Sequence, residues 1–130
     1  MALTADTQIN DNAVLKQRAR RYVSHALVEV RRIKWLPLFC QSAVLLDIST
    51  SGFKLEFTGE VRATPGLQYW IHIPLSPLGI PAPSRLICHC EVRWFDDHRY
   101  RIGGTFLNLS KTDMMLIEQI VSSLKTRGQL

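Results

Sequence analysis

The chain has 130 residues, of which 46% are hydrophobic and 21% charged, and this composition fits a single globular domain with a real core. Its formal net charge of +5 favours anionic partners, such as nucleotides, nucleic acid or an acidic surface, without choosing among them. No apolar run approaches the roughly 20 residues that a membrane span needs, and no apolar signal sequence opens the chain. We therefore expect a cytoplasmic protein without membrane insertion.

The positive charge is concentrated near the N-terminus, where seven of the sixteen lysines and arginines fall within residues 16–34. Residues 1–15 are largely polar and lack a hydrophobic period, which predicts a flexible leader. The basic stretch that follows permits either a short helix, with a cap at Asp11 or Asn12, or a flexible segment that orders only on a partner. We expect one domain over residues 16–126 and a tail over residues 127–130.

Alternating apolar and polar residues predict an all-β fold from residue 26 onward. The expected strands cover residues 26–31, 44–48, 53–57, 67–73, 85–95 and 99–107. In the second strand, Val44, Leu46 and Ile48 are expected to share one face. In the fifth strand, one face is expected to carry Leu86, Cys88, Cys90, Val92 and Trp94. Between the second and third strands, the STSG turn predicts a positive φ at Gly52.

The end of the chain changes to a helical pattern. Ser110, followed three residues later by Asp113, has the spacing of a helix cap. Apolar residues at helical spacing follow it, namely Met114, Ile117, Val121 and Leu124. Six antiparallel strands in a meander, closed or nearly closed into a barrel, with one helix covering an opening or edge, are the simplest architecture that buries these faces.

The sequence gives little support for catalysis or metal binding. The four histidines are scattered, no serine or cysteine has a nucleophile-elbow context, and no glycine-rich loop precedes a helix, so we expect no enzyme and no cofactor. Cys88 and Cys90 lie on one strand face and offer thiolates to zinc. Because that face is otherwise apolar, we favour the alternative in which both act as small hydrophobic core residues.

A short motif after the second strand is more specific. Asp47, Ser49 and Gly52 fit the pattern D/N-x-S-x-x-G, and the arginine-rich stretch QRARRYVSH precedes the first strand. Together with RIGGTFLNLS near the end and the closing amphipathic helix, these features make residues 17–125 resemble the PilZ domain, the bacterial receptor module for cyclic di-GMP. The resemblance implies a six-stranded antiparallel β-barrel with a C-terminal α-helix and a basic N-terminal segment.

The resemblance also implies a ligand site. The residues it assigns to cyclic di-GMP are Arg20, Arg21, Asp47, Ser49 and Gly52, with Arg18, Ser24, His25 and Arg93 as auxiliary candidates. Arginine suits a cyclic dinucleotide because its guanidinium reaches phosphate oxygens and the O6 and N7 atoms of guanine. A carboxylate accepts the N1 and N2 protons of guanine, and glycine leaves room for close backbone approach. The alternative for the motif alone is an ordinary turn in which Asp47 and Ser49 bond neighbouring amides.

The sequence departs from the family in its second motif, R-x-x-x-R. Arg20 is followed at that spacing by Ser24, and Arg21 by His25, so the second arginine is missing. The loss of one charged hydrogen bond, about 1.5 to 3 kcal/mol, predicts roughly 10- to 150-fold weaker binding unless another cation compensates.

Two main hypotheses follow from the intact and the incomplete motif. In the first, the protein is a cyclic di-GMP receptor whose flexible basic segment closes on the ligand and changes the surface shown to an unidentified protein partner. In the second, it is a degenerate PilZ adaptor that acts through protein contacts alone. A third hypothesis, nonspecific nucleic-acid binding by the basic segment, fits the charge, whereas specific nucleic-acid recognition is not expected.

Overall fold

The computed structural model describes residues 26–36 and 40–128. The elements in chain order are β1 (Leu27–Arg31), β2 (Gln41–Ile48), β3 (Gly52–Phe57), β4 (Gln68–Pro74), the short 3₁₀ helix η1 (Ser76–Leu78), β5 (Arg85–Asp96), β6 (Arg101–Leu107) and α2 (Lys111–Thr126). The predicted leader and the candidates Arg18, Arg20, Arg21, Ser24 and His25 lie outside the described residues.

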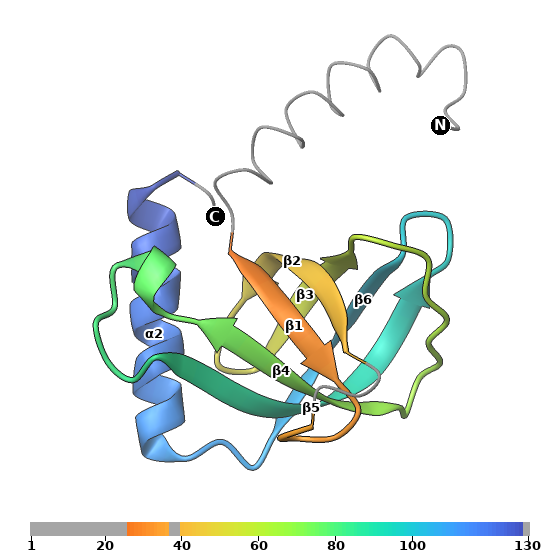
Figure 1. The fold of residues 1–130 in the computed structure, drawn as a ribbon, viewed down its shortest axis with the longest axis horizontal. Helices are drawn as coiled ribbons and strands as arrows, with labels where there is room; N and C mark the ends of the chain where they lie inside the picture. Colours follow the sequence, from red (N-terminus) through yellow and green to blue (C-terminus); the bar gives the residue numbers. More distant parts are fainter. Residues whose placement is uncertain (1–25, 37–39, 129–130) are drawn as a thin grey trace, which may run out of the picture.

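The six strands form a closed antiparallel barrel in the order β1-β2-β3-β6-β5-β4 (Figure 1). The all-β class, the six strands and the C-terminal helix are confirmed, but the simple meander is wrong. Each half of the chain is a three-stranded meander, and the halves meet where β1 pairs with β4 and β3 pairs with β6. The connection 58–67 is too long for a tight hairpin and carries the chain from β3 to the far side of β1.

The interior of the barrel is filled by alternate residues of the strands. Inward-facing residues include Val28, Val30, Phe53, Leu55, Phe57, Tyr69, Ile71, Ile73, Leu86, Cys88, Cys90, Val92 and Ile102. The predicted alternation is therefore correct for β1, β3, β4 and most of β5. Closure also leaves none of the six strands as an open edge, so each backbone ladder finds partners on both sides.

Two β-bulges overturn the predicted faces of β2 and β5. In β2, Leu46 is an extra residue between Leu45, which pairs with Leu55, and Asp47, which pairs with Lys54. Leu45 thus lies in the core, whereas Leu46 is half-buried. A bulge inserts one residue and reverses the alternation beyond it, which a strict period of two does not anticipate.

The second bulge lies at Arg93 of β5, between Val92 and Trp94. It moves Trp94 from the predicted inner face to the outside, where the residue is 43% exposed. There its indole covers Gly103, because a Cβ at Gly103 would lie only 2.3 Å from the Trp94 ring. Phe95 packs against the core in its place.

Helix α2 begins with the predicted cap. The Ser110 hydroxyl accepts a hydrogen bond from Asp113 N (3.0 Å), and the Asp113 carboxylate accepts one from Ser110 N (3.3 Å), which makes a capping box. The buried face of the helix consists of Leu116, Ile117, Ile120 and Leu124. Ile117 and Leu124 were predicted for this face, whereas Met114 is 38% exposed and Val121 only half-buried.

Helix α2 stands beside η1 and the start of β5, at the end of the barrel where β1 begins and β2 ends (Figure 1). The Ser123 hydroxyl donates a hydrogen bond to the Leu78 carbonyl (2.7 Å), which ties the helix to η1. We call this end of the barrel the helix end. The connections 58–67 and 97–100 lie at the opposite end.

Candidate functional site

The predicted motif forms a compact turn at the helix end. Ser49 N donates to the Gly52 carbonyl (2.9 Å), and the Ser49 hydroxyl accepts weakly from Ser51 N (3.2 Å) and Gly52 N (3.4 Å). The Asp47 Oδ1 atom accepts from Ile48 N (2.9 Å). Asp47 and Ser49 therefore bond neighbouring amides, as in an ordinary turn, yet both side chains remain exposed to a ligand. We call residues 47–52 the motif turn.

Gly52 has a different structural role from the predicted one. Positive φ occurs at Gly66, Gly79 and Gly128 among the described glycines, so the prediction of a positive φ at Gly52 is wrong. A Cβ on Gly52 would instead lie 2.3 Å from the carbonyl oxygen of Gly104 on β6. Position 52 therefore requires glycine because β3 passes very close to β6 there. The requirement comes from this close approach and not from a positive φ.

The bulge at Leu46 decides where Asp47 points. Because one residue is inserted, Asp47 lies on the outer surface and Ile48 is buried behind it. The register then places Asp47 opposite Lys54, Lys54 opposite Gly103, and Gly103 opposite Trp94. This row crosses the outer wall of the barrel over four strands.

Lys54, which lies opposite Asp47 in this row, was not predicted as a site residue. Its position follows from the pairing of β2 with β3 and from the bulge at Leu46, so no local signal in the sequence marks it. The predicted auxiliary residue Arg93 is exposed and faces Glu91 at 3.7 Å. Since β3 and β6 separate its strand from β2, the structure does not bring Arg93 to the motif turn.

The described chain begins beside the motif turn. The Ala26 carbonyl accepts a hydrogen bond from Leu45 N (2.9 Å), two residues before Asp47. This bond extends the pairing of β1 with β2, in which Leu27 lies opposite Val44. The basic segment that precedes Ala26 is therefore joined to the barrel at the same end as the motif turn.

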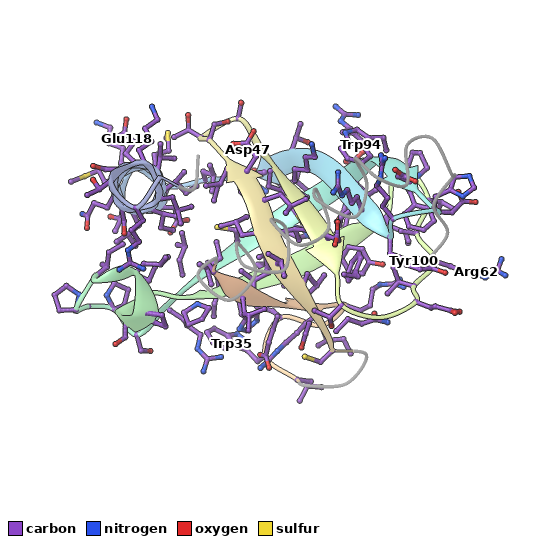
Figure 2. All side chains as sticks on the ribbon, turned by 90° about the horizontal axis from the view of Figure 1, so that it is seen from above. Trp35, Asp47, Arg62, Trp94, Tyr100 and Glu118 are labelled. Carbon is purple, nitrogen blue, oxygen red and sulfur yellow. The ribbon has the colours of Figure 1, made fainter. Side chains whose placement is uncertain are left out.

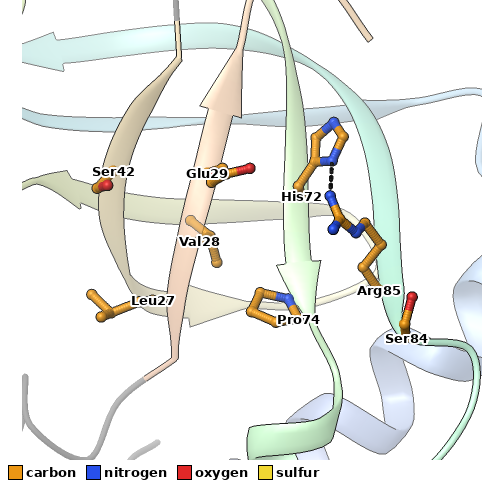
Figure 3. Close-up of a pocket in the computed structure, with 8 residues that line it drawn as sticks. All are labelled: Leu27, Val28, Glu29, Ser42, His72, Pro74, Ser84 and Arg85. Atoms are coloured by element: carbon orange, nitrogen blue, oxygen red, sulfur yellow. Dashed lines mark hydrogen bonds between the residues drawn. The ribbon is translucent and has the colours of Figure 1, made fainter. Parts of the chain in front are cut away.

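A cleft of about 320 Å³ lies elsewhere, over β1 and β4 (Figure 3). It is lined by Leu27, Val28, Glu29, Ser42, His72, Pro74, Ser84 and Arg85. His72 is only 2% exposed, and its Nδ1 atom faces Arg85 Nη1 at 3.3 Å. Because a guanidinium can only donate, Nδ1 is the acceptor and Nε2 carries the proton that it donates to the Lys34 carbonyl (2.7 Å). The structure thus holds His72 neutral.

The pKa of His72 is lowered from its ordinary value of 6.5, mainly because burial disfavours the charged ring, and the nearby Arg31 and Arg85 charges act in the same direction. The Lys34 carbonyl and Glu29 oppose this shift.

Acid is therefore expected to destabilise the protein through His72. Below pH 6.5 the unfolded chain binds a proton at this histidine that the folded chain resists, so the free energy of unfolding falls as the pH drops from about 7.5 to about 5.5. Urea unfolding across this range would measure the slope. The amide of His72→Gln can donate to the Lys34 carbonyl and accept from Arg85 without titrating. In this variant the free energy of unfolding should depend less on pH. An unchanged pH dependence would show that His72 is not its source. Carboxylates with lowered pKa, Glu29 and Asp96, contribute only at more acid pH.

The two cysteines of β5 belong to the core. Cys88 and Cys90 are fully buried, and burial raises the pKa of each thiol to about 12, so both are protonated at neutral pH. Within residues 26–36 and 40–128, no three His, Cys, Asp or Glu side chains are grouped to hold a metal ion. In the same part of the chain, no helix is long and apolar enough to cross a membrane.

Comparisons with known proteins agree with this fold. The family model of the PilZ domain matches residues 16–123. The PilZ domain with c-di-GMP of YcgR from Escherichia coli is similar, with a TM-score of 0.59 and 15% identity over 80% of this chain and 84% of the other. The Bacillus subtilis inhibitor of motility MotI/DgrA has a TM-score of 0.55 and 11% identity over 79% of this chain and 46% of the other. A search of curated proteins gave no match. Since the family model spans most of the sequence, the chain belongs to the PilZ domain family.

Proposed function

We propose that the protein binds cyclic di-GMP at the motif turn, with Arg20 and Arg21 of the basic segment before Ala26 supplying the cationic contacts. The observation that carries this proposal is the hydrogen bond between Leu45 N and the Ala26 carbonyl, which places the attachment point of the basic segment beside Asp47. The family is one of binding and adaptor modules rather than enzymes, which fits a site built for recognition. The structure of the similar YcgR domain contains c-di-GMP, which also supports this ligand.

The motif turn offers groups that suit a guanine base. The exposed Asp47 carboxylate can accept the N1 and N2 protons of guanine, and charged acceptors form the stronger hydrogen bonds. The Ser49 hydroxyl, held by the amides of Ser51 and Gly52, is fixed at the rim for a further contact. Lys54, opposite Asp47, adds a positive charge to the same wall. Asp47 and Ser49 therefore suit a base that carries hydrogen-bond donors, and Lys54 suits a negatively charged phosphate.

The basic segment before Ala26 is long enough to reach this site. Arg20 precedes Ala26 by a span that, fully extended at about 3.5 Å per residue, covers roughly 20 Å. That reach brings Arg20 and Arg21 within contact of a dinucleotide seated on the motif turn. In this proposal, binding draws the basic segment onto the barrel and thereby changes the surface offered to a protein partner.

A second candidate function rests on the incomplete arginine motif. Ser24 and His25 stand at the two positions where the spacing requires the second arginine. Without that guanidinium, the protein would be an adaptor that has lost the ligand and acts through protein contacts alone. The two candidates differ in one measurable property, the affinity for cyclic di-GMP.

Isothermal titration calorimetry of the full chain with cyclic di-GMP tests the proposal. We expect saturable binding in the micromolar range, weakened by Arg20→Ala on the order of 10- to 150-fold because a charged contact is lost. Arg62→Ala is the matched control, since Arg62 is an exposed arginine in the connection 58–67 at the opposite end of the barrel. Absence of heat at about 100 µM ligand would favour the adaptor. Measurable binding with equal affinity of both variants would instead show that Arg20 makes no contact with the ligand.

A further inference from the structure

An exposed apolar surface lies on the wall of the barrel away from the motif turn. After β1, the chain places Ile33, Trp35 and Leu36 in solvent, with exposures of 41%, 67% and 48%. These are three of the seven large hydrophobic residues that the described chain exposes, and they fall within four consecutive positions. We call Arg32, Ile33, Lys34, Trp35 and Leu36 the Trp35 loop.

The Trp35 loop is held in place by polar side chains of the barrel. Arg31 Nη1 donates to the Trp35 carbonyl (3.3 Å), and the buried His72 donates to the Lys34 carbonyl (2.7 Å). Because both anchors act on the backbone, the apolar side chains remain turned outward rather than folding into the core. Ile33, Trp35 and Leu36 are thus exposed while the backbone of their loop is anchored to the barrel.

A cation of this surface lies near two aromatic rings. The Lys34 ammonium is 5.2 Å from the Trp35 ring centre and 4.9 Å from that of Trp70. Trp70 in turn stacks on His89, with ring centres 4.2 Å apart and planes inclined by 8°. Aromatic and cationic groups are thus interleaved over the outer face of β4 and β5.

The loop itself carries charge of one sign, although Glu29 and Glu91 lie on the neighbouring strands, where they pair with Arg31 and Arg93. Arg31 is paired with Glu29 at 2.6 Å, which leaves Arg32 and Lys34 as the loop's cations. The sequence from Val30 to Leu46 contains no aspartate or glutamate. The surface therefore favours a partner with negative charge above apolar material.

The combination of groups distinguishes among anionic partners. Protein interface cores are depleted of lysine, whereas the Lys34 ammonium lies near two tryptophan rings of this surface. Base stacking in nucleic acid uses aromatic faces but gives no role to aliphatic residues such as Ile33 and Leu36. A bilayer interface accommodates all of them, because tryptophan prefers the headgroup level, aliphatic side chains enter the acyl boundary, and lysine and arginine reach the lipid phosphates.

We propose that the Trp35 loop is a peripheral membrane-binding site for anionic phospholipid. The contact lies on the bilayer surface and spans nothing, which is a different mode from the insertion of a transmembrane segment. It goes beyond cyclic di-GMP binding and is spatially separate from it. Figure 2 shows Trp35 and Asp47 on opposite sides of the molecule, so a bilayer at Trp35 leaves the motif turn in water.

Vesicle sedimentation of the full chain tests the site. The probes are phosphatidylcholine vesicles, alone or with about one third phosphatidylglycerol. We expect binding to the anionic vesicles, reduced about 25-fold by Arg32→Glu, since each charge near the surface contributes about fivefold. Trp35→Ser should reduce it on the order of tenfold through lost apolar burial.

Matched controls separate the loop from general charge and hydrophobicity. Lys111→Glu makes the same charge change on helix α2, and Met115→Ser removes an apolar side chain that is 60% exposed on that helix. Both should bind anionic vesicles as the unmodified protein does, and circular dichroism should show all four variants folded.

Several results would overturn the proposal. These are no binding to anionic vesicles, equal binding to neutral ones, or an equal loss in the control variants. Vesicle binding that is unchanged in Trp35→Ser, together with loss of a dimer in that variant, would assign the surface to a second copy of the chain. Loss of oligonucleotide binding in Arg32→Glu, with vesicle binding unchanged, would assign it to nucleic acid.

Discussion

Gly104→Ala is expected to lower the free energy of unfolding by about 3 kcal/mol, at the upper end of the usual cost of overpacking. A Cβ at this position would lie 2.1 Å from the carbonyl oxygen of Glu91 and 3.0 Å from the Phe53 ring. The first contact is with backbone, which cannot move aside without opening the ladder between β5 and β6. Urea denaturation, followed by circular dichroism, measures the loss.

Gly59→Ala provides the control for Gly104→Ala. A Cβ on Gly59 meets no atom within 4 Å, and its backbone is not in the left-handed region. The same chemical change there should alter the free energy of unfolding by less than about 0.5 kcal/mol. If both variants were equally stable, the tight contact between β5 and β6 would not exist in solution.

Asp47→Ala is expected to weaken cyclic di-GMP binding by roughly 10- to 150-fold, because a charged acceptor for guanine is removed. Its melting temperature should stay close to that of the unmodified protein, since the side chain is exposed. Calorimetric titration and thermal unfolding of the same sample measure the two quantities. A matched control is Asp97→Ala, since Asp97 is also exposed, with 77% of its side chain in solvent, but lies in the turn after β5.

Gly52→Ala is a useful comparison to Asp47→Ala within the same motif. Because its Cβ would meet the Gly104 carbonyl, this variant should lose stability as well as affinity. If Asp47→Ala lowered the melting temperature as much as Gly52→Ala, the aspartate would be structural. If Asp47→Ala bound the ligand as tightly as the unmodified protein, the motif turn would not be the site.

The elements of the fold could be predicted because their signals are local. Alternation in β1, β3 and β4 and the cap of Ser110 and Asp113 depend on neighbours a few residues away. The strand order could not be predicted in the same way. Pairing of Leu55 with Ile102 depends on how the connection 58–67 crosses the barrel, and no residue within it specifies that path.

The candidate site was predictable only in part. The positions of Asp47 and Ser49 in a turn follow from the motif, but the reason for Gly52 lies in Gly104, a residue far along the chain. The outward direction of Asp47 and Trp94 depends on bulges, which shift a strand by one residue without a distinctive sequence signature. The roles of Arg20 and Arg21 in the basic segment remain a prediction from sequence.

The strand order has a consequence for the symmetry of the barrel. If β1, β2 and β3 are exchanged with β4, β5 and β6, every strand keeps an equivalent pair of neighbours in the barrel. The two halves of the chain are therefore topologically equivalent. In each half it is the middle strand, β2 or β5, that carries a bulge, at Leu46 or Arg93. Bulges bend and coil a sheet, and closure of a small barrel requires such curvature. The barrel is thus curved at two equivalent places in its strand order, once in each half of the chain.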